Sequence, residues 1–141
     1  MTTHSAPTVV IGSGLVGLTT AVLLARAGHR VTVLERDAAL PPVRAADAWR
    51  DWLRPGVNQF RHPHLMLPRW HQVVRRELPE LPDLLLAAGA RPTNLLHLQP
   101  TSVTHGWQPG DEDFDTLAVR RPVLEAALVQ LAEHEPGVTV R

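Results

Sequence analysis

Short apolar runs and one amphipathic segment alternate near the N-terminal end of the sequence. Residues 8–11 (TVVI) and 31–34 (VTVL) are β-branched apolar runs of the length and kind that a buried parallel strand shows. Between them, apolar residues at helical spacing predict a helix over 15–27, and Gly28 follows where a left-handed residue ends many helices. The pattern predicts strand, helix and strand, which is typical of a right-handed parallel crossover.

The C-terminal end repeats the alternation of helix and strand. Pro122 can open a helix, an apolar stripe follows it, and Pro136-Gly137 can end it. Residues 138–140 (VTV) then begin a third strand, which we expect to form the exposed edge of a short parallel sheet. An exposed edge strand can pair with another chain, so we expect a partner chain or self-association there.

A long insert, residues 38–113, separates the second and third strands of this predicted sheet. It holds most of the 13 prolines and all four tryptophans, and its apolar pattern is irregular. Within it we predict helices over 69–78 and 83–88 and a strand over 93–98, and a further strand over 116–120 follows it. The sequence therefore predicts one α/β domain over 1–141, a partial Rossmann-like, three-layer fold with a short parallel sheet and a long irregular insert.

Composition narrows the classes of protein to which the chain can belong. The 44% apolar and 20% charged fractions are those of a globular protein, and no apolar run approaches a membrane span. Residues 1–8 lack the basic and apolar regions of a secretory leader, so we expect a cytoplasmic protein. The absence of cysteine excludes disulfides, thiolate metal sites and thiol nucleophiles, and a formal charge of zero argues against a nucleic-acid binder.

A glycine motif carries the strongest chemical signal, and it lies between the first predicted strand and the first predicted helix. Its residues are Gly12-Ser13-Gly14-Leu15-Val16-Gly17. In a dinucleotide-binding motif of this spacing, the first glycine allows a tight turn, the second lets a pyrophosphate approach, and the third lets the helix pack on the strand. The helix N-terminus then presents free N–H groups and a partial positive charge to the phosphates.

An acidic residue, Glu35, follows the second strand and lies 18 positions after Gly17. An acid at this position can accept a hydrogen bond from the adenosine ribose and would repel a 2′-phosphate, which favours FAD or NAD over NADP. A purely structural turn is the alternative, but strand, helix, second strand and acid all agree with dinucleotide binding. The motif alone does not separate FAD from NAD, because both present the same adenosine diphosphate.

Three stretches of the sequence resemble FAD-dependent monooxygenases of the para-hydroxybenzoate hydroxylase type, and particularly their bacterial epoxidase-like and hydroxylase-like members. They are VVIGSGLVGLTTAVLLARAGHRVTVLERD, RPGVNQFRHPHLMLPR and LAVRRPVLEAALVQLAEHEPGVTVR. An R-x-x-L motif opens a helix in that family, and Arg121-Pro122-Val123-Leu124 matches it. The resemblance implies that Arg121 approaches the phosphate or ribityl part of FAD and that Arg36 lies beside the adenosine.

The same resemblance implies a function for the chain. We expect the FAD-binding N-terminal segment of a flavin-dependent oxidoreductase, a monooxygenase that hydroxylates or epoxidises a small aromatic or unsaturated substrate with NAD(P)H and O2. Family members carry a later Gly-Asp segment and a substrate-covering sheet that are absent here, so we expect a truncated or split product that can be inactive alone. We expect the insert to cover the isoalloxazine ring of FAD. The alternative is that the insert is an ordinary surface segment.

Two other functions stay open at this point, an NAD-binding dehydrogenase module and a non-catalytic nucleotide-binding fragment. No catalytic residue can be named from the sequence. We expect no metal site, because His62 and His64 flank a proline and have no acid close to them in sequence.

Overall fold

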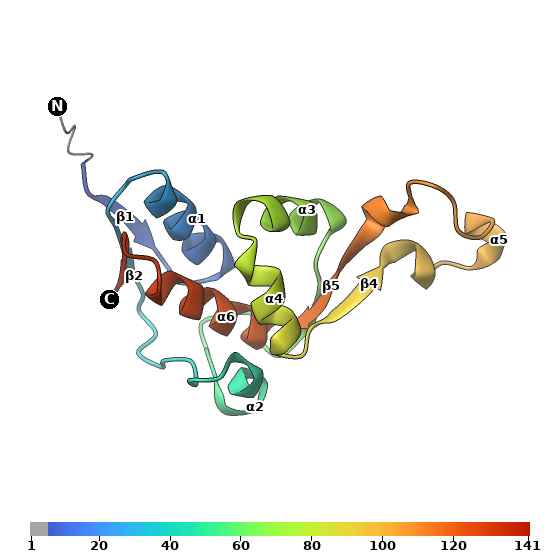
Figure 1. Ribbon diagram of the computed structural model, residues 1–141. Helices are drawn as coiled ribbons and strands as arrows, with labels where there is room; N and C mark the ends of the chain where they lie inside the picture. The colour runs from blue at the N-terminus through green and yellow to red at the C-terminus, as the bar shows by residue number, and fades with distance from the viewer. Residues whose placement is uncertain (1–5) are drawn as a thin grey trace.

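The computed structural model describes residues 6–141, which form two small sheets joined by helices (Figure 1). Residues 1–5, on which the expectation of a missing secretory leader partly depends, lie outside the described residues. Across 6–141, none of the helices has the length and apolar character that a membrane crossing requires.

The first sheet is parallel and contains the three strands that the sequence predicts. They are β1 (Thr8–Ile11), β2 (Val31–Leu34) and β6 (Val138–Val140), with β2 in the middle. Helix α1 (Leu15–Arg26) connects β1 to β2. Thr8 lies beside Val31, which lies beside Val138, so the strands are in register from their first residues. The predicted α/β fold class with a short parallel sheet is confirmed, and so is the edge position of β6.

Among residues 6–141, helices cover only one face of this sheet, so the described residues form two layers there and not the three that the sequence predicts. The expectation that residues 8–11 form a fully buried strand is wrong. Val31 and Val33 pack beneath the helices and are at most 2% exposed. Val9 and Ile11 point to the opposite face and are 58% and 87% exposed. Side chains alternate between the faces of a strand, so an unbroken apolar run on a half-covered sheet leaves every second residue exposed.

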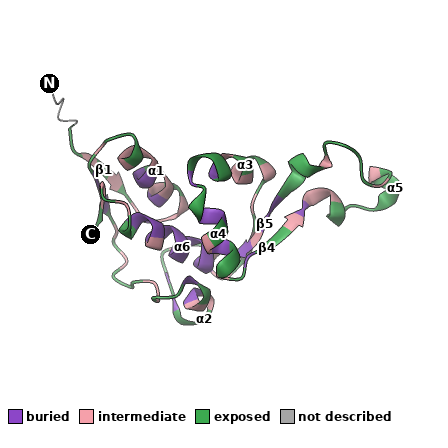
Figure 2. Cartoon of the chain, in the orientation of Figure 1, coloured by how far each residue is buried: buried purple, intermediate pink, exposed green. Residues whose placement is uncertain are grey.

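Helix α6 (Arg121–Glu133) forms the centre of the molecule and lies between α1 and α4 in Figure 1. Ten of its 13 residues are buried, and Figure 2 shows the helix as the most continuously buried segment. Pro122 lies in its first turn, where backbone N–H groups have no acceptor within the helix, so the N–H that proline lacks is not needed. The predicted helix is therefore confirmed, and it is buried over more of its surface than the predicted apolar stripe alone would require.

The insert and the strand after it build a second, antiparallel sheet. Strand β5 is its middle strand, with β3 and β4 on either side. The bounds are β3 (Pro63–Leu65), β4 (Arg91–Asn94) and β5 (Asp115–Arg120). The strand predicted over 93–98 is only partly right: the Asn94 side chain accepts a hydrogen bond from the N–H of Leu96 and starts a 3-10 turn over 95–98 instead.

The insert also contains four short α-helices, of which α3 and α4 flank the second sheet. They are α2 (Ala48–Asp51), α3 (Pro68–Glu77), α4 (Glu80–Ala87) and α5 (Thr101–Thr104). The helix predicted over 69–78 is confirmed, whereas the one predicted over 83–88 begins earlier, at Glu80, because Pro82 fits within the first turn. Beyond these helices, β4 and β5 extend to the exposed end that carries α5 (Figures 1 and 2).

Candidate functional site

The glycine motif forms the tight loop between β1 and α1. Gly12 has a φ of 94°, in the left-handed region that only glycine adopts at little cost. A Cβ built on Gly17 would lie 2.0 Å from the carbonyl oxygen of Gly12, so no side chain fits there. The first and third glycines are thus required by the backbone itself, as the motif predicts.

The N-terminus of α1 is open at the second glycine. Gly14 is the N-cap, no side chain caps the helix, and its first turn contains no acidic residue. A Cβ on Gly14 would meet nothing within 4 Å. The first N–H groups of a helix have no partner inside it, so an uncapped end of this kind is suited to an anion such as a pyrophosphate. Of the next two motif residues, Val16 is 81% exposed and Leu15 packs against the core.

Ser13 and Glu35 form hydrogen bonds with each other. The backbone N–H and the hydroxyl of Ser13 donate to Oε2 of Glu35 over 2.7 and 2.8 Å. The N–H of Asp37 donates to Oε1 of the same carboxylate over 2.9 Å. Burial would raise the pKa of Glu35, but these donors, with the charge of Arg54, lower that pKa to about 2. Glu35 is therefore a fixed carboxylate at neutral pH.

Arg54 belongs to this site although no sequence argument singled it out. It follows α2 in the insert, and its side chain is only 3% exposed. Its Nη2 donates to Oε2 of Glu35 over 2.5 Å, and its Nη1 donates to the carbonyl oxygen of Ser13 over 3.2 Å. Its Nε reaches Oδ2 of Asp37 over 3.3 Å. Burial by itself lowers the pKa of Arg54, but the carboxylates around it raise that pKa overall.

Glu125, inside α6, connects Arg54 to the predicted residue Arg121. Its Oε2 accepts from Nη1 of Arg54 and its Oε1 from Nε of Arg121, each over 2.8 Å. Arg121 also donates to the carbonyl oxygen of Asn58 over 3.0 Å. The structure thus brings Arg121 into one network with Ser13 and Glu35.

Arg36, which the family resemblance places beside the adenosine, lies outside this network. It is exposed, and its guanidinium lies against the backbone of Gly56. Of the two residues that sequence reasoning missed, Arg54 begins the RPGVNQFRHPHLMLPR stretch on which the family resemblance partly rests. Glu125 follows Arg121 by four positions in α6, which is the spacing of an intrahelical ion pair.

The residues present fit an adenine dinucleotide. The open N-terminus of α1 suits its pyrophosphate. The two carboxylate oxygens of Glu35 differ in the number of hydrogen bonds that they already accept. Oε2 accepts three hydrogen bonds and Oε1 accepts one, from Asp37. A carboxylate oxygen has two lone pairs, so Oε1 is the atom that can still accept from a ribose hydroxyl.

Comparison with known families identifies the class of dinucleotide. A family model described as "FAD dependent oxidoreductase" matches residues 8–140, nearly the whole chain. The chain belongs to the FAD-dependent oxidoreductase family. The predicted cofactor, FAD, is thereby confirmed, and the alternative of NAD as the resident dinucleotide is set aside.

Individual relatives within this family are longer than the chain itself. A D-amino acid dehydrogenase of Phenylobacterium zucineum (strain HLK1) is 39% identical in an alignment 87 residues long, which covers 56% of this chain and 20% of that protein. PqsL of Pseudomonas aeruginosa, described as "a probable FAD-dependent monooxygenase", matches 95% of this chain with a TM-score of 0.62 and 17% identity. The p-nitrophenol 4-monooxygenase PnpA of Pseudomonas putida DLL-E4 matches 97% with a TM-score of 0.58 and 18% identity. The chain spans 32% of each of these two structures.

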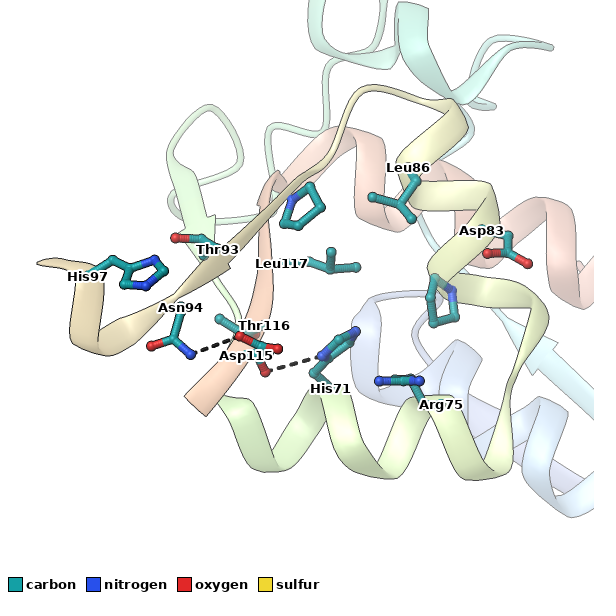
Figure 3. Close-up of a pocket in the computed structure, with 12 residues that line it drawn as sticks. His71, Arg75, Asp83, Leu86, Thr93, Asn94, His97, Asp115, Thr116 and Leu117 are labelled. Atoms are coloured by element: carbon teal, nitrogen blue, oxygen red, sulfur yellow. Dashed lines mark hydrogen bonds between the residues drawn. The ribbon is translucent and has the colours of Figure 1, made fainter. Parts of the chain in front are cut away.

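A separate cavity of about 460 Å³ lies between α3, α4 and the second sheet (Figure 3). His71 points into it and its Nδ1 lies 3.2 Å from the carbonyl oxygen of Asp115, while Asn94 donates to Oδ1 of Asp115 over 2.8 Å. None of the predicted cofactor residues lines it. Within residues 6–141, no group of histidines and carboxylates is placed to bind a metal ion.

Proposed function

We propose that this chain is the FAD-binding N-terminal segment of a flavin-dependent monooxygenase. The observation that carries the proposal is the uncapped N-terminus of α1 beside a fixed carboxylate, Glu35, in a chain of the FAD-dependent oxidoreductase family. The shared fold with PqsL and PnpA supports the choice of monooxygenase among the reactions of that family.

In this proposal the motif residues, Arg36 and Arg121 each contact a different part of FAD. The glycine loop, from Gly12 to Gly17, and the first turn of α1 hold the pyrophosphate through backbone N–H groups. Glu35 accepts from the adenosine ribose through Oε1. Arg121 would approach the phosphate or ribityl chain, and Arg36 the adenosine, from its exposed position.

The proposed overall reaction uses one NAD(P)H, one proton and one O2 for each substrate molecule. One oxygen atom enters a small aromatic or unsaturated substrate, the other leaves as water, and NAD(P)+ is released. FAD, when bound, supplies the redox chemistry of this reaction, and the residues of this chain bind and orient it. We further propose a cytoplasmic location and contact with another chain through the exposed edge at β6.

Titration of the purified chain with FAD, NADH and NADPH tests the binding proposal. We expect FAD to bind and to give a yellow protein with quenched flavin fluorescence. Glu35→Ala should weaken FAD at least about tenfold, because a hydrogen bond to a charged group contributes about 1.5–3 kcal/mol. Glu133→Ala, at an exposed position on α6, is the matched control and should leave the affinity unchanged. Equal FAD affinity of wild type and Glu35→Ala would remove the ribose role.

A second candidate is the oxidation of an amino acid, favoured by the 39% identity to a D-amino acid dehydrogenase over 87 residues. Two assays on the FAD-loaded protein separate the candidates. A monooxygenase consumes O2 in the presence of NAD(P)H and an aromatic or unsaturated compound. An amino acid dehydrogenase reduces an artificial electron acceptor when a D-amino acid is added. FAD binding without either activity would indicate a non-catalytic nucleotide-binding fragment.

A further inference from the structure

Glu125 is a carboxylate inside an otherwise apolar part of the core. It is 0% exposed, and the residues on either side of it in α6, Leu124 and Ala126, are buried as well. A buried charge is strongly unfavourable unless it is paired and fully hydrogen-bonded. Glu125 meets this condition with two arginines, one on each oxygen. An apolar residue would fill the same space without needing either partner, so the charge itself needs an explanation.

The two arginines come from different parts of the chain. Arg121 is the first residue of α6 and lies one helical turn before Glu125. Arg54 lies 71 positions away, in the insert. The same Nη1 of Arg54 that donates to Glu125 also donates to the carbonyl oxygen of Ser13, and Nη2 donates to Glu35. Glu125 therefore fixes Arg54, and Arg54 contacts the glycine loop and Glu35.

We propose that Glu125 is a positioning residue for FAD, acting through Arg54. By holding Nη1, it directs Nη2 to Oε2 of Glu35, so that Oε1 is left for the ribose. This inference rests on the proposed binding of FAD at the glycine loop. It assigns a role to a side chain that is fully buried and for which the sequence analysis predicts no function.

The balance of charge explains why a neutral replacement should disturb the site. Three carboxylates, Glu35, Asp37 and Glu125, surround the single guanidinium of Arg54. In Glu125→Gln the amide N–H2 would face guanidinium N–H groups, and two donors cannot bond to each other. Arg54 would then be attracted only towards Glu35 and Asp37, and we expect its guanidinium to compete with the ribose for the Glu35 carboxylate.

A double-mutant cycle on FAD affinity tests this inference with the chain as it exists. We expect Glu125→Gln to raise the Kd for FAD about tenfold in the wild-type background and less than about twofold in Arg54→Met. The visible circular dichroism of bound FAD should change in Glu125→Gln and not in Glu133→Gln, the matched control on α6. A merely structural role would lower the unfolding midpoint and weaken FAD by the same factor in both backgrounds, which would overturn the proposal.

A second pair of variants covers the case in which Glu125→Gln does not fold. Arg54→Met and Arg54→Met with Glu125→Leu should bind FAD with equal affinity, since the residue through which Glu125 acts is already gone. A further loss of more than about fivefold on adding Glu125→Leu would overturn the proposal. If wild type binds FAD and Glu125→Gln binds it equally well, this inference alone fails. If wild type does not bind FAD, the proposed function fails with it.

Discussion

Residues 6–37 and the insert, residues 38–113, contribute to the candidate site in different ways. The first region supplies the glycine loop, the open end of α1 and Glu35, all within one continuous β-α-β unit. The insert supplies a single buried side chain, Arg54, from a segment without regular structure. The difference shows that one continuous segment of the chain forms the backbone of the site. The charge of its carboxylate is balanced by a residue that is distant in sequence and that tertiary packing places beside it.

Removing Arg54 should have the largest effect, because it leaves three carboxylates without their shared cation. We expect Arg54→Met to lower the free energy of unfolding by about 3–5 kcal/mol, the usual result of breaking a buried ion pair from one side. Urea unfolding of the FAD-free chain measures this. Arg50→Met, an exposed arginine four positions earlier, is the control and should unfold at the wild-type midpoint. Equal midpoints for both variants would mean that the insert contributes no essential charge.

Two glycine variants separate the folding and binding contributions of the first region. In Gly17→Ala the new methyl group would lie 2.0 Å from the carbonyl oxygen of Gly12, so the loop must move. We expect a loss of about 1–3 kcal/mol in stability, together with weak FAD binding. Gly14→Ala meets no atom within 4 Å and should keep wild-type stability. We expect its methyl group to take up open space at the N-terminus of α1, where we propose that the pyrophosphate binds. Weak FAD binding by a fully stable Gly14→Ala is the decisive observation.

The pH dependence of the free energy of unfolding should show the contribution of the Glu35 carboxylate, which accepts hydrogen bonds from both Ser13 and Arg54. Folding lowers its pKa from 4.5 to about 2, so the stability it contributes is complete above pH 4.5 and is lost as the pH falls towards 2. Urea midpoints measured across this range should fall in wild type by more than in Glu35→Gln. The exposed control, Glu133→Gln, should follow wild type. Parallel curves for wild type and Glu35→Gln would contradict the lowered pKa.

The smallest effect is expected at Asn94, a buried residue of the insert that lies outside the network of Arg54. Its Nδ2 donates to the carbonyl oxygen of Asp111 over 2.7 Å and to Oδ1 of Asp115 over 2.8 Å. Asn94→Ala should lower stability by about 0.5–1.5 kcal/mol and leave the affinity for FAD unchanged. Isothermal titration and urea unfolding of the same preparation check both. A weaker FAD complex would show that the insert acts on the site as a whole and not through Arg54.

The sequence predicted the elements with strong local patterns and was less successful where patterns were weak. β1, α1, β2, α6 and β6 all occur where the apolar runs and the glycine and proline signals indicate. In the insert, the start of α4 and the end of β4 differ from prediction, because a proline fits inside a first turn and an asparagine starts a new turn. The second sheet was not predicted, since pairing between distant strands leaves no local signal.

The sequence by itself determined the family, the cofactor class and the backbone of the glycine loop. The loop depends on residue types at fixed spacing within one crossover, where geometry follows directly from the chain. The family and the choice of FAD depend on similarity over residues 8–140. Only the tertiary structure decided that Ser13 and Arg54 hold Glu35, and that Glu125 holds Arg54. The physical reason is that a buried charge must be matched in space, and its partners can lie anywhere along the chain.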